Sequence, residues 1–78
     1  MKTMLQRLQS VAPMVATAIK NGHNVAMDFD ASGIQINHWH GNKTEQMSIR
    51  NNWTPDCIEA EQDREELEIM QYLINLNK

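Results

Sequence analysis

Side chains that could do chemistry are densest in one stretch of the chain, MDFDASGIQINHWHG. Asp28, Asp30 and Ser32 alternate and Gly33 follows, as at the opening of a calcium-binding loop, where oxygen ligands converge and glycine permits a sharp bend. The position of the bidentate glutamate is instead occupied by Trp39. We therefore expect a hairpin turn in which Asp30 or Ser32 binds local backbone amides and Gly33 has a positive φ. Weak divalent-cation binding by Asp28 and Asp30 is the alternative.

Two histidines follow in the same stretch, His38 and His40. In a strand they point to the same face, and paired imidazoles at this spacing can share a zinc or copper ion. A complete site needs a third ligand, for which the candidates are His23, Glu45 and Cys57. We expect the two imidazoles to cap the end of a buried sheet face, and weak metal binding by His38 and His40 is the alternative.

Nucleophilic catalysis has little support in this sequence. Cys57 lies near an expected helix start, where the helix dipole lowers a thiol pKa, but Asp56 and Glu59 beside it oppose thiolate formation. Cys57, Ala60 and Leu67 are predicted to share one side of the helix, so we expect a buried structural cysteine. The sequence contains no glycine-rich phosphate loop or nucleophile elbow. We expect no enzymatic activity and no cofactor.

The elements that would position these side chains follow from periodicity. Apolar residues at spacings of three and four predict a helix over about 2–20, ended by Asn21-Gly22. Pro13 lies inside this helix and predicts a kink. A shorter helix capped by Ser10 is the alternative.

From residue 24 the apolar period changes to two, which predicts strands around 24–30, 34–37 and 46–50. The turn-forming residues between the strands predict a three-stranded antiparallel meander. One face of this sheet is apolar. The other would face solvent or a partner and carries mainly polar residues: Asp28, Asp30, Gln35, Asn37, Trp39, Gln46, Ser48 and Arg50.

A second helix is predicted over about 55–76, because Thr54 can cap it and Pro55 fits its first turn. Its first half is mostly charged, and its last half is apolar nearly all round, which predicts that two surfaces cover it. The order α-β-β-β-α predicts an α+β fold with both helices packed on one face of the sheet. At this length we expect one small domain over 1–78.

Charge is distributed unevenly along the chain. The net charge is −3, but residues 1–54 carry five basic and three acidic residues, whereas 55–78 carry two basic and seven acidic ones. The lone cysteine excludes a disulfide within the chain. There is also no apolar run long enough to span a membrane. We therefore expect a small soluble protein of the cytoplasm that does not bind a membrane.

The acidic second helix is the most informative feature for function. The charge run is typical of a solvated face, but it also suits a basic surface on a partner. We expect an interaction module, an accessory or inhibitory protein of the kind often carried by phages and plasmids, that binds a basic nucleic-acid-handling protein and no nucleic acid directly. A self-associating homodimer is the alternative. The predicted contact residues are acidic, aromatic or apolar: Trp39, Trp53, Glu59, Glu61, Asp63, Glu65, Glu66, Glu68, Ile69, Tyr72 and Leu76.

Overall fold

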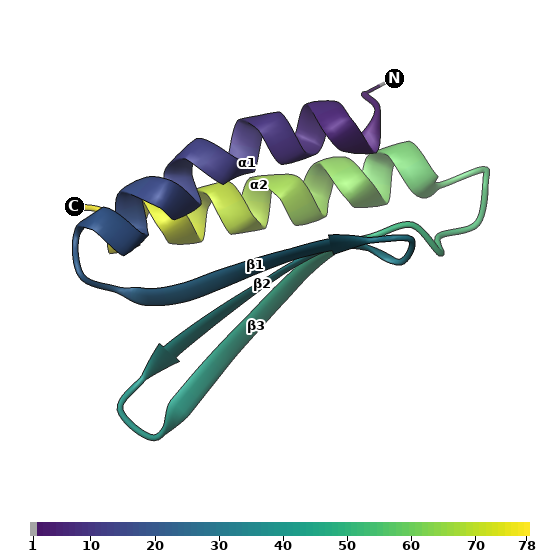
Figure 1. Cartoon of the computed structure of the whole chain (residues 1–78). Coiled ribbons are helices and arrows are strands. Elements are labelled where there is room, and N and C mark those ends of the chain that lie inside the picture. The colour runs from purple at the N-terminus through teal and green to yellow at the C-terminus, as the bar shows by residue number, and fades with distance from the viewer. Residues whose placement is uncertain (1) are drawn as a thin grey trace.

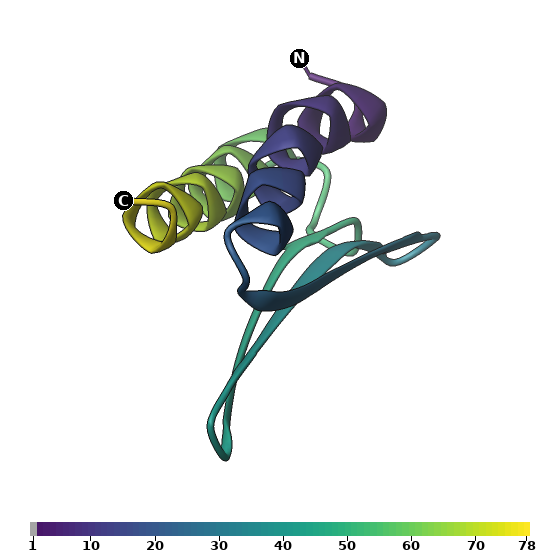
Figure 2. The ribbon, with the colours of Figure 1, turned by 60° about the vertical axis from the view of Figure 1, so that its left-hand side comes forward.

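The computed structural model describes residues 2–78, in which one helix, three strands and a second helix follow one another (Figure 1). Their bounds are α1 Met4–Lys20, β1 Asn24–Asp30, β2 Gly33–His40, β3 Lys43–Arg50 and α2 Ile58–Leu76. The strands pair antiparallel in the order β1-β2-β3, and both helices lie on the same face of the sheet (Figures 1 and 2). The α+β fold predicted from periodicity is confirmed.

The first helix is capped by its own sequence. Thr3 accepts a hydrogen bond from the Gln6 amide, and the Gln6 side chain accepts one from the Thr3 amide, which forms a capping box. The helix then continues to Lys20 with Pro13 inside it. The continuous helix is therefore confirmed, and the shorter helix starting at Ser10 is wrong.

The turn between β1 and β2 has the predicted chemistry. The Asp30 carboxylate accepts a hydrogen bond from the Ser32 amide at 2.9 Å and one from the Ser32 hydroxyl. Gly33 has φ +127°, and a Cβ there would lie 2.0 Å from the carbonyl oxygen of Ile49 on β3. Glycine is thus required at position 33 both for its backbone conformation and for the close approach of β3.

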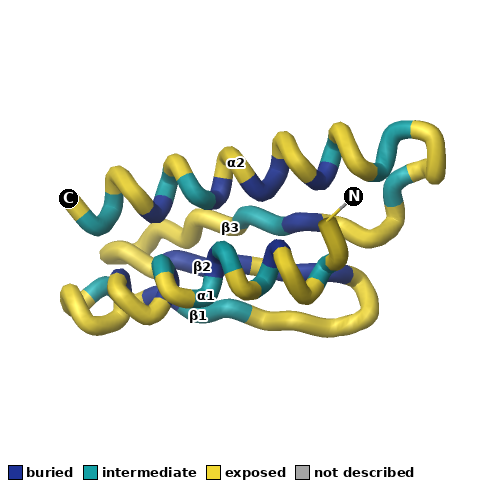
Figure 3. The backbone as a smooth tube through the Cα atoms, turned by 90° about the horizontal axis from the view of Figure 1, so that it is seen from above, coloured by how far each residue is buried: buried dark blue, intermediate teal, exposed yellow. Residues whose placement is uncertain are grey.

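The two helices run side by side in the same direction (Figure 1). Arg7 lies beside Asp63 and Glu66 at one end, and the Asn77 side chain donates to the Met14 carbonyl oxygen at the other, over 3.2 Å. Viewed from above, α1 lies along β1 and β2, and α2 along β3 (Figure 3). The core between helices and sheet is aliphatic: Val11, Val15, Ala18, Val25, Ile34, Ile36, Ile49, Ile69 and Leu73.

The second helix begins three residues later than predicted. Residues 54–57 form a turn in which the Cys57 amide donates to the Thr54 carbonyl oxygen, and the Thr54 hydroxyl contacts the Cys57 sulfur instead of capping the helix. Cys57 is half-buried, and both Ala60 and Leu67 are exposed. The predicted buried cysteine stripe is wrong, because the residues that face the core are those in register with Ile69 and Leu73.

Two parts of the sheet have no cover. The face opposite the helices is open, and the hairpin that joins β2 to β3 extends away from both helices (Figure 2). Its tip, residues 39–46, is exposed throughout. Among residues 2–78, neither helix is long and apolar enough to cross a membrane.

Candidate functional site

The acidic residues of α2 divide into a buried and an exposed set. Glu66 is buried and accepts from Arg7 over 3.0 Å and from Lys2 over 2.9 Å. Glu65 is buried beside β3 and accepts from the Arg50 backbone amide at 3.0 Å and from its guanidinium at 2.9 Å. Carboxylates are buried only when they are paired. Glu65 and Glu66 therefore stabilise the fold, and their prediction as partner contacts is wrong.

Two further predicted contacts also belong to the interior. Ile69 is fully buried in the core. Trp53 is half-buried, its indole N–H donates to Glu65 over 2.8 Å, and the Arg50 guanidinium lies 4.1 Å from the centre of its ring. Arg50, Trp53 and Glu65 thus join β3 and the following loop to α2. Ile69 is unavailable to a partner, and the indole N–H of Trp53 is already used.

The exposed acids are largely neutralised by arginine. Arg64 pairs with Glu61 at 2.8 Å and with Glu68 at 2.7 Å, and these carboxylates raise its pKa. Asp63 pairs with Arg7 at 2.7 Å. Four cations, three of them from outside the helix, therefore pair with five acids of α2: Lys2, Arg7, Arg50 and Arg64. The negative charge that α2 presents to a partner is smaller than its sequence indicates.

What α2 does expose is an apolar stripe. Leu67 and Ile74 are 56% and 49% exposed and lie seven residues apart, so they share one side of the helix, with half-buried Met70 between them. We call Leu67, Met70 and Ile74 the outer stripe. It borders a hollow of about 310 Å³ lined by Lys2, Asp63, Glu66, Leu67 and Met70. Sequence reasoning named none of these three as contacts, although the seven-residue spacing of Leu67 and Ile74 was visible.

The other predicted contacts lie elsewhere. Tyr72 and Leu76 are half-buried and pack against the core. Trp39 is 41% exposed, and its place in the β2 register puts it on the open face of the sheet, away from the helices. The predicted set is therefore divided between the interior, the outer face of α2, where Glu59 is also exposed, and the open sheet face.

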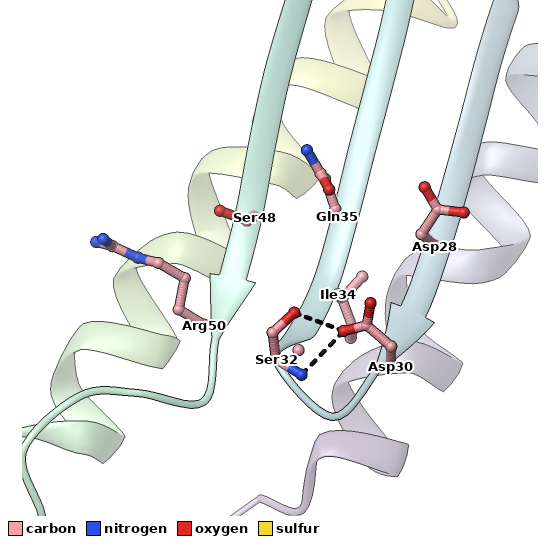
Figure 4. A pocket seen from close by; sticks show the side chains of 8 residues that line it. Asp28, Asp30, Ser32, Ile34, Gln35, Ser48 and Arg50 are labelled. Atoms are coloured by element: carbon pink, nitrogen blue, oxygen red, sulfur yellow. Dashed lines mark hydrogen bonds between the residues drawn. The ribbon is translucent and has the colours of Figure 1, made fainter.

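The open sheet face holds a shallow hollow of about 180 Å³ beside the first hairpin (Figure 4). Asp28, Gln35 and Ser48 lie side by side across the three strands. Asp30 is turned to Ser32, and these hydrogen bonds lower the pKa of its carboxyl. Arg50 borders the hollow, but its guanidinium binds Glu65.

The histidines form a cluster on the inner face of the sheet. His38 is 6% exposed, its Nδ1 lies 2.5 Å from the Tyr72 hydroxyl, and its ring stacks on His40 with centroids 4.7 Å apart. His23 approaches edge-on, and Glu45 lies 3.8 Å from His40. The expected capping of the sheet face is thus seen at His38, whereas His40 is exposed.

Of the proposed third metal ligands, His23 and Glu45 lie beside the pair. Cys57 does not join them: its sulfur contacts Thr54 before the start of α2. Within residues 2–78, no three His, Cys, Asp or Glu side chains are arranged to hold a metal ion.

Burial shifts the pKa values of His38 and Tyr72. The pKa of His38 lies below its usual 6.5, mainly because the ring is buried and also because His40 and His23 are close to it. The pKa of Tyr72 lies above its usual 10.0, mainly because of burial and also because of the nearby Glu45 carboxylate. Both side chains are therefore held neutral at pH 7. The contact between His38 and Tyr72 could not be read from the sequence, because it joins residues 34 positions apart.

Comparison with protein families, with curated proteins and with solved structures finds no match to this chain.

Proposed function

We propose that this chain is a non-enzymatic interaction module that binds a protein partner through the outer stripe and the charged residues beside it. The observation that carries the proposal is the exposure of Leu67 and Ile74 on a helix whose opposite side packs against the core. Exposed aliphatic side chains that lie outside the core are suited to the buried centre of an interface.

The spacing of the stripe favours this surface over the other helix. Leu67 and Ile74 are about 10 Å apart along the axis, with Met70 between them and a hollow alongside. On α1, Leu5 and Ile19 are also about half exposed, but they lie about 21 Å apart. The α2 pair can therefore enter a single apolar groove on a partner.

The chemistry of the partner follows from what surrounds the stripe. Glu59 and Asp63 are exposed on the same helix, and Glu61 and Glu68 lie beside Arg64. A partner with an apolar groove and a basic rim would complement this surface, and the rim charges would accelerate association more than they strengthen it. A basic protein that handles nucleic acid fits this description, and the chain would act as its accessory or inhibitory subunit.

The test is affinity capture from a native lysate, repeated with paired variants. The double variant Leu67→Ser/Ile74→Ser should lose the captured partner. The matched control Leu5→Ser/Ile19→Ser, which alters equally exposed side chains on α1, should retain it. Equal capture by both variants would refute the proposal.

Sedimentation of the purified chain distinguishes the alternative. If the chain is a dimer that Leu67→Ser/Ile74→Ser converts to a monomer, the stripe binds a second copy of the chain, and self-association replaces a foreign partner.

A further inference from the structure

We propose that the His38–Tyr72 contact is a proton-operated latch, which holds the end of the β2–β3 hairpin against α2 at neutral pH and releases it when His38 gains a proton. This regulatory role goes beyond the proposed partner binding, because the latch lies on the inner face of the sheet and the outer stripe lies on the outside of α2.

The latch is one of two places where hydrogen bonds tie α2 to the sheet in residues 2–78. At the C-terminal end of β3, Arg50 binds Glu65, and its carbonyl oxygen accepts from Gln62 over 2.8 Å. The second place is near the hairpin that joins β2 to β3, where Nδ1 of His38 on β2 contacts the Tyr72 hydroxyl. The hairpin tip beyond His38 is exposed and extends away from the helices (Figure 1). Loss of this contact therefore frees the hairpin end, while the Arg50 end stays attached.

The surroundings of His38 disfavour a positive charge. His23, from the loop after α1, approaches edge-on with centroids 5.9 Å apart, and His40 stacks from the same strand at 4.7 Å. Lys43 on β3 lies opposite His40 in the register. The one carboxylate facing the cluster among the described residues is Glu45, on β3 opposite His38. The neighbouring His40 and His23 therefore make it harder for His38 to gain a proton.

Release does not come from the loss of a hydrogen-bonding group, because the Nδ1–H of an imidazolium could still donate to the tyrosine oxygen. Protonation changes the solvation free energy of His38, because the ring then carries a positive charge. An imidazolium with 6% exposure beside two other imidazoles is poorly solvated. When the hairpin end separates from α2, water can hydrate the His38 imidazolium. The lowered pKa of His38 agrees with this cost.

The experiment is a pH titration of the full chain, from 7.5 to 5.0, followed by two-dimensional NMR and amide hydrogen exchange. The His38 ring, the Trp39 indole and the amides of 40–46 should shift together, with a midpoint below 6.5. After correction for intrinsic exchange rates, protection of the 38–46 amides should fall by up to about tenfold per pH unit within the titration window. The amides at the Arg50 end of β3 should keep their protection.

Three variants separate a latch from a purely structural contact. His38→Gln keeps a side-chain N–H for Tyr72 but carries no charge, so its hairpin amides should be equally protected at pH 7.5 and 5.0. His40→Gln alters an exposed side chain and should still fold. Removal of this neighbour should move the His38 midpoint upward. Tyr72→Phe should loosen the hairpin already at pH 7.5.

Two results would overturn the latch. One is titration of His38 with no change in the hairpin amides. The other is an unchanged pH response in His38→Gln. If His38→Gln does not fold, His40→Gln decides the question. A latch predicts that the pH midpoint at which the hairpin amides lose protection rises in this variant, whereas a structural contact without proton coupling predicts an unchanged midpoint.

Discussion

At the scale of single residues, the most unusual group is the guanidinium of Arg7, which has no exposed surface. Its Nη1 donates to Asp63 and Glu66, whereas no hydrogen-bond partner is present for Nε or Nη2 among the described residues. A buried arginine of this kind is tolerated because its carboxylate partners are fixed on the adjacent helix. Arg7 therefore joins α1 to α2 at one end of the helix pair.

Replacement of Arg7 by methionine should be strongly destabilising. Glu66 would remain buried with Lys2 as its only cation among the described contacts, at a cost of about 3–5 kcal/mol in the free energy of unfolding. The double variant Arg7→Met/Glu66→Leu should recover a large part of this loss, because it removes the buried carboxylate that has lost its buried partner. Urea denaturation of the two variants checks this, and a double variant less stable than Arg7→Met contradicts it.

A glycine pair isolates the effect of close packing in the first hairpin. Gly33 and Gly22 both have a positive φ, but only Gly33 would bring a Cβ against the backbone of Ile49. Gly22→Ala should cost about 1–3 kcal/mol from backbone strain alone. Gly33→Ala should cost more, because β3 must also move. Thermal unfolding measures both, and equal losses would show that the approach of β3 imposes no further penalty.

At the scale of elements, local signals were sufficient to predict the strands, the first hairpin and the capping of the sheet face by His38. The alternation of Ile34 and Ile36 and the turn chemistry of Asp30 are properties of adjacent residues. The face of α2 was not predictable in this way. Its carboxylates Glu65 and Glu66 are buried because cations from β3 and from the start of the chain reach them, and helical periodicity contains no information about those partners.

The helix starts show the same limit. The sequence predicted Thr54 as the cap of the second helix, but Cys57 occupies the cap position and makes no side-chain capping bond. Thr3→Ala should therefore cost about 1 kcal/mol, because it removes the capping box of α1. Thr54→Ala should change stability by less than about 0.5 kcal/mol. Chemical denaturation compares them, and a larger loss for Thr54→Ala would place the functional cap there.

At the scale of the whole molecule, the dependence of stability on pH follows from two neutral groups, the buried His38 and the half-buried Tyr72. The fold lowers the pKa of His38 below 6.5, so the unfolded chain takes up a proton first and stability falls as the pH drops below that value. The fold raises the pKa of Tyr72 above 10.0, so the unfolded chain ionises first and stability falls at higher pH. We expect a plateau between about 6.5 and 10.

Denaturant unfolding at a series of pH values tests this plateau. His38→Gln should flatten the acid side, and Tyr72→Phe should flatten the alkaline side. If the loss of stability at acid or alkaline pH is unchanged in the corresponding variant, another titratable group causes it.

The parallel course of α1 and α2 has a mechanical consequence. The first helix begins at one end of the molecule, and the second finishes at the opposite end (Figure 1). A pulling force applied at Thr3 and Asn77 would slide the helices along each other in opposite directions, so that contacts along the helix pair bear the load together instead of parting one after another. Tension in this direction should meet more resistance than the same force applied across the helix pair, which would part these contacts one at a time.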